Sequence, residues 1–261
     1  MLDPLIVFGH PLMQGFWRLI SFGVFLVQLI KSCFRNWTRG FSVMVQVTSF
    51  QIYFTCIQAL PAVFFLALFI VAVVLSQADD FFGTGDTSKF VATLFEVVIV
   101  RELAPLLTCL IVVGRSGTAV ASELTSMTAN EEIDALKIMG VDPMHYLVIP
   151  RLIGVTLSVI CLSITFSLIS LFATMGIGYY LEAISPSAFL AGVVQCVTGL
   201  DIFLNLFKST VFGAAIALIC AFWGFSARGS NTEIPQMTTH AVISSVFWCF
   251  VISGLITILV Y

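Results

Sequence analysis

The most regular feature of the sequence is a series of long apolar runs that contain few charged residues. A helix needs about 20 apolar residues to cross a hydrocarbon core about 30 Å thick, and it satisfies its backbone polar groups within the segment. The pattern therefore predicts an all-α integral membrane protein with about five transmembrane helices. The predicted spans are residues 57–77, 90–114, 152–181, 202–227 and 234–261.

The N-terminal region, residues 1–45, follows a different pattern. Only twelve uncharged residues separate Arg18 from Lys31. As a helix they would reach about 18 Å, which is too short to cross a membrane. Trp17 and Trp37 flank this stretch, and tryptophan and basic residues are typical of the boundary between membrane and water. We therefore expect an interfacial region with a short helix that lies along the membrane surface.

The distribution of lysine and arginine predicts the orientation of the spans. The N-terminal region holds four of these residues, and the connection after the second span holds Arg115, Lys137 and Arg151. The connections at the other ends of the spans, residues 78–89 and 182–200, are mainly acidic. By the positive-inside rule, we expect the N-terminus in the cytoplasm and the C-terminus on the opposite side of the membrane.

Composition favours one membrane domain and excludes several classes of function. Hydrophobic residues make up 59% of the 261 residues and charged residues 10%, and the mean hydropathy is +1.09. The apolar runs follow one another without a linker, so we expect a single domain over residues 1–261. A net charge of −3 argues against a nucleic-acid partner. The cysteines stand singly and the histidines far apart, so no metal site is expected.

The motifs of an ATPase or a hydrolase are missing from the sequence. No G-x-x-x-x-G-K-[ST] loop is present to hold ATP phosphates, and neither H-E-x-x-H nor G-x-S-x-G occurs. We therefore expect a chain that is not an enzyme and that holds no cofactor of its own.

A short helix is predicted over residues 128–140, in the connection between the second and third spans. Thr128 and Glu131 fit a capping box at its start, and Gly140 and Pro143 end it. Its apolar residues share one stripe. It is either a solvated loop helix or a coupling helix that docks in a groove of a cytoplasmic ATPase. The coupling surface would consist of Glu131, Glu132, Ile133, Asp134, Leu136, Lys137, Met139 and Gly140.

Charged residues inside the apolar runs mark a candidate site, because each costs about 2.5 to 3.5 kcal/mol at the bilayer centre unless it is paired or hydrated. Arg101 and Glu102 lie in the middle of the second run. Pro105 is expected to leave the carbonyl of Arg101 without its helical donor. The fourth run carries a polar stripe at positions i, i+4 and i+7, which share one helix face. That stripe consists of Asp201, Asn205 and Lys208.

Two interpretations of these charges are open. In the first, Lys208 pairs with Glu102 or Glu96 only to hold two helices together. In the second, the charges line a lipid cavity in which Arg101 or Lys208 binds a phosphate. A hydrated cavity predicts that single neutral substitutions lower transport but barely change stability, because water solvates the remaining charge. Two aromatic residues at the outer end of the first span either belong to the membrane interface or act as cavity and gate residues. They are Phe81 and Phe82.

A set of motifs between residues 101 and 151 resembles the MlaE permease family, whose members occur with MCE-domain proteins. Both the residue types and their spacing are similar. The motifs are Arg101-Glu-Leu-Ala-Pro105, Gly114-Arg-Ser-Gly117, Glu123-Leu-x-x-Met127, Glu131-Glu-Ile-Asp-Ala-Leu-Lys-Ile-Met-Gly140, Asp142-Pro143 and Pro150-Arg151.

The resemblance implies the transmembrane permease subunit of an ABC transporter in the inner (cytoplasmic) membrane, with a cytoplasmic N-terminus and a periplasmic C-terminus. It implies transport of phospholipid or a related lipid between that membrane and a periplasmic MCE-domain protein. It also implies a homodimer, two separate ATPase subunits that bind ATP and Mg²⁺, and in some members a STAS-domain protein. Among the charged residues, it implies cavity positions for Arg101, Glu102 and Lys208.

An ion-coupled secondary transporter is the alternative function. It would use Glu102 as a proton carrier and would work without an ATPase. No internal repeat is visible in the sequence, which argues against a transporter built from two matching halves.

Overall fold

The computed structural model describes residues 20–33, 41–81, 87–180, 185–227 and 231–260. Every regular element within these residues is a helix, and five helices are long and apolar enough to cross a membrane. The predicted all-α fold with five candidate spans is confirmed. These helices are Met44–Gln77, Phe90–Ala129, Met144–Tyr180, Gly199–Phe225 and Ile234–Val260.

The first three spans are composed of shorter helical segments joined end to end, whereas each of the last two is a single helix. Short helices occupy the connections. The labelled segments are α2 (Phe41–Thr55), the 3-10 turn η1 (Ile57–Ala59), α3 (Leu60–Phe81), α4 (Thr87–Leu94), the π-helix η2 (Phe95–Leu103), α5 (Ala104–Val112), the π-helix η3 (Val113–Gly117), α6 (Thr118–Ala129), α7 (Glu132–Ile138), the π-helix η4 (Met144–Val148), α8 (Ile149–Tyr180), α9 (Pro186–Cys196), α10 (Gly199–Phe225), the 3-10 turn η5 (Asn231–Glu233) and α11 (Ile234–Val260).

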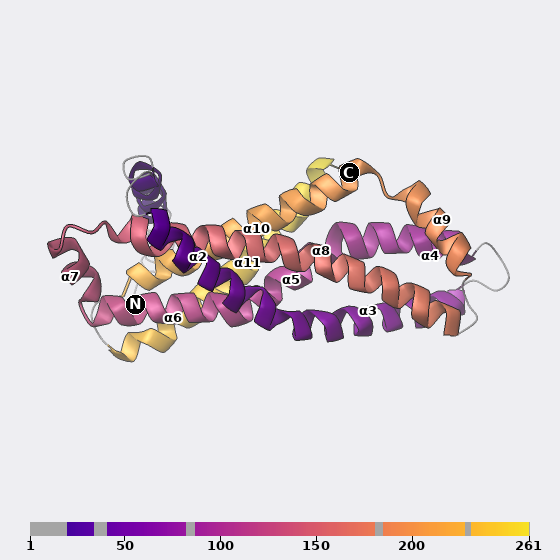
Figure 1. Cartoon of the computed structure of the whole chain (residues 1–261), viewed down its shortest axis with the longest axis horizontal. Helices are drawn as coiled ribbons and strands as arrows, with labels where there is room; N and C mark the ends of the chain where they lie inside the picture. The colour runs from indigo at the N-terminus through magenta and orange to yellow at the C-terminus, as the bar shows by residue number, and fades with distance from the viewer. Residues whose placement is uncertain (1–19, 34–40, 82–86, 181–184, 228–230, 261) are drawn as a thin grey trace, which may run out of the picture.

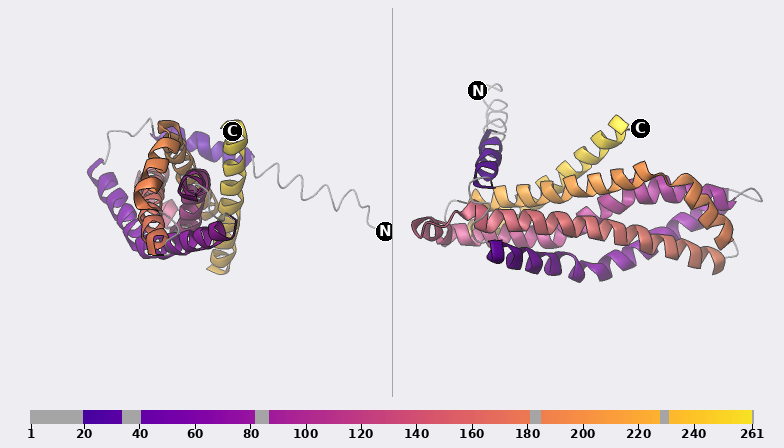
Figure 2. Two further views of the ribbon diagram at one scale, coloured as in Figure 1. Left: turned by 90° about the vertical axis from the view of Figure 1, so that its right-hand side faces the viewer. Right: turned by 45° about the horizontal axis from the view of Figure 1, so that its top comes forward.

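The spans form an elongated bundle with different short helices at its two ends (Figure 1). α7 lies at one end, together with the start of α2 and the start of α11. α4 and α9 pack together at the other end. The C-terminal end of α11 projects from the bundle in the right-hand view of Figure 2. The connections between spans thus lie at alternating ends of the bundle, as the predicted order of the spans requires. Which end faces the cytoplasm stays a prediction.

Three spans extend further than the apolar runs predict, and the third of them begins at Met144 instead of residue 152. The first begins at Met44, because α2 continues the helix through polar residues that pack on α8. A side chain on Gly154 of α8 would come within 2.8 Å of Gln51. The second span continues past Gly114 to Ala129 over 40 residues, a length of about 60 Å. Hydropathy detects the part of a helix that lies in lipid, so it misses the part that packs on other helices beyond it.

A short apolar helix, Ile20–Cys33, precedes the first span. It stands across the long axis of the bundle (Figure 2). The buried ring of Phe25 contacts Phe222 of α10 at a centroid distance of 5.9 Å, and Ser32 donates a hydrogen bond of 2.8 Å to Asp142. The predicted short helix is therefore present, and its position along a membrane surface stays a prediction.

The turn between α6 and α7 differs from the predicted capping box. α6 runs on to Ala129, and the hydroxyl of Thr128 donates to the carbonyls of Leu124 (2.7 Å) and Gly224 (3.0 Å). Glu131 makes the turn with a left-handed φ of 59°, and no side chain caps α7. The predicted helix start at residue 128 is therefore wrong, because the preceding span had not yet ended.

The predicted end of this helix at Gly140 is confirmed. Gly140 has a φ of +77°, a conformation that glycine adopts without steric cost. Its N–H donates to the carbonyl of Lys137, and the N–H of Val141 donates to that of Leu136, both at 3.0 Å. These two bonds form a Schellman motif, which satisfies carbonyls that the end of a helix leaves without donors.

A close approach of two helix backbones involves Thr156 of α8 and Gly213 of α10. A Cβ atom on Gly213 would lie 2.6 Å from the Cα atom of Thr156, so only glycine allows this approach. We expect Gly213→Ala to lower the free energy of unfolding by about 1 to 3 kcal/mol, because the two backbones must separate. Gly176→Ala on α8 is the matched control, because nothing lies within 4 Å of its Cβ position. Melting temperatures of the purified variants test this, and equal values for both would contradict it.

Candidate functional site

The candidate site is centred on a stretch of π-helix in the second span. This segment, Phe95–Leu103, contains the predicted charged pair Arg101 and Glu102. Pro105 follows at the start of α5 and has no N–H group. It therefore cannot donate to the carbonyl of Arg101, four residues earlier, or to that of Val100, five residues earlier. π-Helical turns are frequent at functional sites, because the wider winding changes the direction of the side chains.

Two side chains of α10 donate to these carbonyls in place of Pro105. Asn205 Nδ2 donates to Val100 O at 2.6 Å, and Lys208 Nζ donates to Arg101 O at 3.2 Å. Both donors, together with Asp201, are buried on one face of α10. The predicted polar stripe is thus one helix face, and it packs against the second span rather than facing open space.

Lys208 is bonded mainly to Glu102. Its ammonium group lies 2.7 Å from Glu102 Oε1 and donates to the hydroxyl of Thr257 on α11 at 3.0 Å. Thr257 also donates to Glu102 Oε1 at 2.8 Å, and Ser253 donates to Glu102 Oε2 at 3.4 Å. The second, fourth and fifth spans therefore meet at one carboxylate.

Arg101, the other member of the predicted charged pair, contacts two carboxylates. It pairs with Glu96, five residues earlier, and its Nε atom lies 2.9 Å from Asp201 Oδ1. Asp201 also accepts hydrogen bonds from the backbone N–H and the hydroxyl of Thr198, which begin α10 as a capping box. Glu96 thus pairs with Arg101, and not with Lys208 as one prediction allowed.

The charged residues differ in their access to the surface. Lys208 is 1% exposed, whereas the side chains of Arg101 and Glu102 are 21% and 34% exposed. The predicted pairing of Lys208 with Glu102 is present, because their charged groups lie 2.7 Å apart. Of these five polar residues, Arg101 and Glu102 are accessible enough to line a cavity, while Asp201, Asn205 and Lys208 support them from inside the protein.

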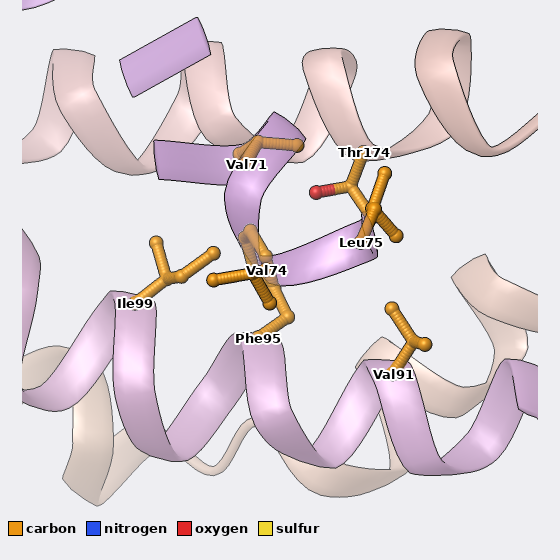
Figure 3. A pocket seen from close by; sticks show the side chains of 7 residues that line it. All are labelled: Val71, Val74, Leu75, Val91, Phe95, Ile99 and Thr174. Carbon is orange, nitrogen blue, oxygen red and sulfur yellow. The ribbon is translucent and has the colours of Figure 1, made fainter. Parts of the chain in front are cut away.

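The side of the π-helix that faces the first span is apolar. Phe95 and Ile99 line a narrow crevice with residues of α3 and α8, to which Thr174 contributes a hydroxyl group (Figure 3). The charges of this segment therefore cluster on its other side. Of the predicted gate residues, Phe81 is the last residue of α3 and Phe82 lies outside the described residues.

The candidate coupling surface surrounds α7. Ile133 is buried and Leu136 is partly buried against the core, so these two residues hold the helix in place. Ile138 and Met139 are 87% and 68% exposed and form the apolar part of the free surface. Exposed polar positions surround them, including an ion pair between Lys137 and Asp134 of 2.7 Å. The other exposed members are Glu131, Glu132 and Gly140.

Two residues of α11 that contact the site were not predicted from the sequence. Thr257 and Ser253 are four residues apart in a long apolar run, which places both hydroxyls on one helix face. Ser163 of α8 was missed as well, and its hydroxyl donates to Asn205 Oδ1 at 2.9 Å. Serine and threonine are common in apolar helices because they also bond to their own backbone, so their presence alone gave no signal.

Comparison with known proteins identifies the family. The family model described as Permease MlaE matches residues 48–259. The "Probable ABC transporter permease protein RP096" of Rickettsia prowazekii is 31% identical over 207 residues, which are 79% of this chain and 80% of that protein. The "Probable ABC transporter permease protein slr1045" of Synechocystis is 34% identical over 177 residues, which are 68% of this chain and 67% of that protein.

A plant protein is also similar. The Arabidopsis thaliana "Protein TRIGALACTOSYLDIACYLGLYCEROL 1, chloroplastic" is 32% identical over 151 residues, which are 58% of this chain and 43% of that protein. Relatives that carry the name of ABC permease favour the predicted ABC transporter over the ion-coupled alternative. The match over residues 48–259 shows that the chain is an ABC transporter permease that belongs to the MlaE permease family.

Proposed function

We propose that this permease carries phospholipid or a related lipid. The observation that supports the proposal most directly is the partial exposure of Arg101 and Glu102 within an apolar span. A guanidinium group binds phosphate through two parallel hydrogen bonds. Acyl chains require apolar surroundings, and α10 offers the exposed rings of Phe203 and Phe207. The name of the Arabidopsis relative contains that of a galactolipid, which also favours a lipid as cargo.

A homodimer completes the proposed cavity. Arg101 and Glu102 lie at the surface of one chain, and a lipid with two acyl chains needs a site that is enclosed on several sides. A second copy related by two-fold symmetry would present the same surface and close it. α11 is the least buried of the five spans and exposes large apolar side chains, among them Phe247, Phe250 and Ile258.

The proposed partners follow the resemblance to the family. ATPase subunits bind the exposed side of α7 and hold ATP and Mg²⁺, for which this chain has no phosphate-binding loop. A periplasmic MCE-domain protein exchanges lipid with the permease, and in some members a STAS-domain protein accompanies the ATPase. The complex resides in the inner membrane with the N-terminus and α7 in the cytoplasm and the C-terminus in the periplasm.

Native mass spectrometry combined with lipid crosslinking tests the proposal. The complex purified from membranes should contain two copies of this chain, an ATPase and bound phospholipid. Arg101→Gln should lower crosslinking to a phospholipid that carries a photoreactive acyl chain by about tenfold, because a charged hydrogen bond to phosphate contributes about 1.5 to 3 kcal/mol.

Arg115→Gln is the matched control for the crosslinking experiment. Arg115 lies in the same span, but its side chain bonds to Gln58 and lies over the ring of Phe54 at 5.3 Å. It should crosslink lipid as the parent does. Equal crosslinking by the Arg101 variant, or a complex without lipid, would refute lipid binding at this site.

A further inference from the structure

The side chain of Asn205 forms hydrogen bonds with two other spans and, within the described residues, none with its own helix. Its Nδ2 atom donates to Val100 O of the π-helix, and its Oδ1 atom accepts a hydrogen bond from Ser163 of α8. Asn205 and Ser163 are buried, so water is not available to replace either bond. The amide is thus fixed between two other spans, with its donor group directed at the second span.

The carbonyl that Asn205 satisfies is one that the main chain cannot satisfy through Pro105. In a π-helix, the carbonyl of residue i is bonded to the N–H of residue i+5. For Val100 that residue is Pro105, which has no N–H. An unsatisfied buried carbonyl costs free energy, so the wide winding persists here because α10 supplies the missing donor.

The π-helix in turn determines where the charged side chains lie. Glu96 and Arg101 form an ion pair at a spacing of five residues. In an α-helix, only residues three or four apart are neighbours on the surface, whereas residues five apart are separated by about 140°. The pair therefore depends on the π winding. A return of this segment to α-helical winding would separate it and would rotate Arg101 and Glu102 relative to α5.

We infer that Asn205 is a positioning residue for lipid transport, which holds the second span in its π register by donating to Val100 O. Through this register it fixes the direction of Arg101 and Glu102 without touching the lipid. Ser163 orients the amide of Asn205. The part of this inference that concerns transport rests on the proposed function, whereas the part that concerns helix register does not.

The test compares Asn205→Ala, Pro105→Ala and the double variant in the purified complex. Asn205→Ala should lower the melting temperature by about 3 to 8 °C, because Val100 O loses its donor. It should also lower lipid transport about 10- to 100-fold, because Arg101 and Glu102 would no longer be oriented to bind the lipid. In the double variant, α-helical winding gives both carbonyls a main-chain donor, because residue 105 again has an N–H group for Arg101 O and Ala104 can donate to Val100 O. Since α-helical winding is far commoner than π-helical winding, the segment should become α-helical. The melting temperature should then recover, and transport should stay low.

Thr210→Ala is the matched control on α10. The hydroxyl of Thr210 is exposed and bonds only to the carbonyl of Leu206 in its own helix, so its removal should change neither stability nor transport. A double variant that regains stability and transport together would overturn the inference, because Asn205 would then be a structural residue only.

A structure of the double variant by electron cryomicroscopy provides a readout that does not depend on lipid. We expect α-helical hydrogen bonds across residues 95–103 in place of π-helical bonds. A segment that stays π-helical in the double variant would overturn the positioning role of Asn205. A segment that becomes α-helical while transport stays normal would support the effect on register and would instead refute the role proposed for Arg101 and Glu102.

Discussion

Glu102→Gln is expected to destabilise the protein by about 3 kcal/mol, because it leaves the buried ammonium group of Lys208 without a carboxylate. Lys208 keeps the neutral acceptors Thr257 and Arg101 O, which places the effect at the lower end of the range for a broken buried pair. In a chain of this size the loss corresponds to a fall in melting temperature of about 6 to 12 °C. The hydrated-cavity interpretation predicted almost no change, and the burial of Lys208 reverses that expectation.

Lys208→Gln should destabilise the protein less than Glu102→Gln. Glu102 is one-third exposed, so water can solvate the carboxylate that has lost its cation. The double variant Glu102→Gln/Lys208→Gln should recover most of the stability, because both charges are gone and the amides can still form hydrogen bonds. Lipid transport should stay low in all three variants. A double variant with full transport would show that the pair serves only to join two helices.

Ile138→Asp together with Met139→Asp is expected to release the ATPase from the complex. Both side chains are largely exposed at the C-terminal end of α7, and two charges in an apolar contact would each require desolvation of an unpaired carboxylate. A binding loss of about 4 kcal/mol or more would lower the affinity about a thousandfold. The measurement is co-purification of the ATPase, followed by a titration of purified permease with ATPase.

The control for this experiment is Ile138→Leu with Met139→Leu, which keeps the surface apolar and should retain the ATPase. The melting temperature of the permease alone should stay unchanged in the aspartate variant, because neither side chain packs in the core. Leu136 was part of the predicted docking stripe, but it is partly buried, so an aspartate there would disturb the fold of α7 itself. Retention of the ATPase by the aspartate variant would exclude α7 as its docking site.

The spans could be predicted from the sequence because the bilayer imposes a minimum length of apolar residues on each helix. Their ends could not, because Phe90–Ala129 and Met44–Gln77 continue as helices wherever other helices cover them. A similar ambiguity affected Thr128, whose spacing to Glu131 fits a capping box. The pattern of residues does not show whether a helix begins at Thr128 or is still in progress.

The candidate site was predicted in part. The spacing of Asp201, Asn205 and Lys208 shows that they share a face of one α-helix, and Pro105 marks the interrupted hydrogen bond. The partner of Arg101 could not be predicted, because an ion pair with Glu96 requires a π-helix. A prediction from helical periodicity assumes 3.6 residues per turn, so it places Glu96 and Arg101 on different sides of the helix. Contacts with α11 depend on tertiary packing, which no local pattern encodes.

The length of the second span has a mechanical consequence. The helix continues for 40 residues, and α7 follows its far end through a tight turn at Glu131. A rod about 60 Å long that tilts by about 10° around its midpoint displaces each end by about 5 Å. That displacement equals about one turn of a helix. If the span moves as a rigid rod, a small rotation near Arg101 would therefore produce a large movement of α7, and a force applied at α7 would reach the charged residues.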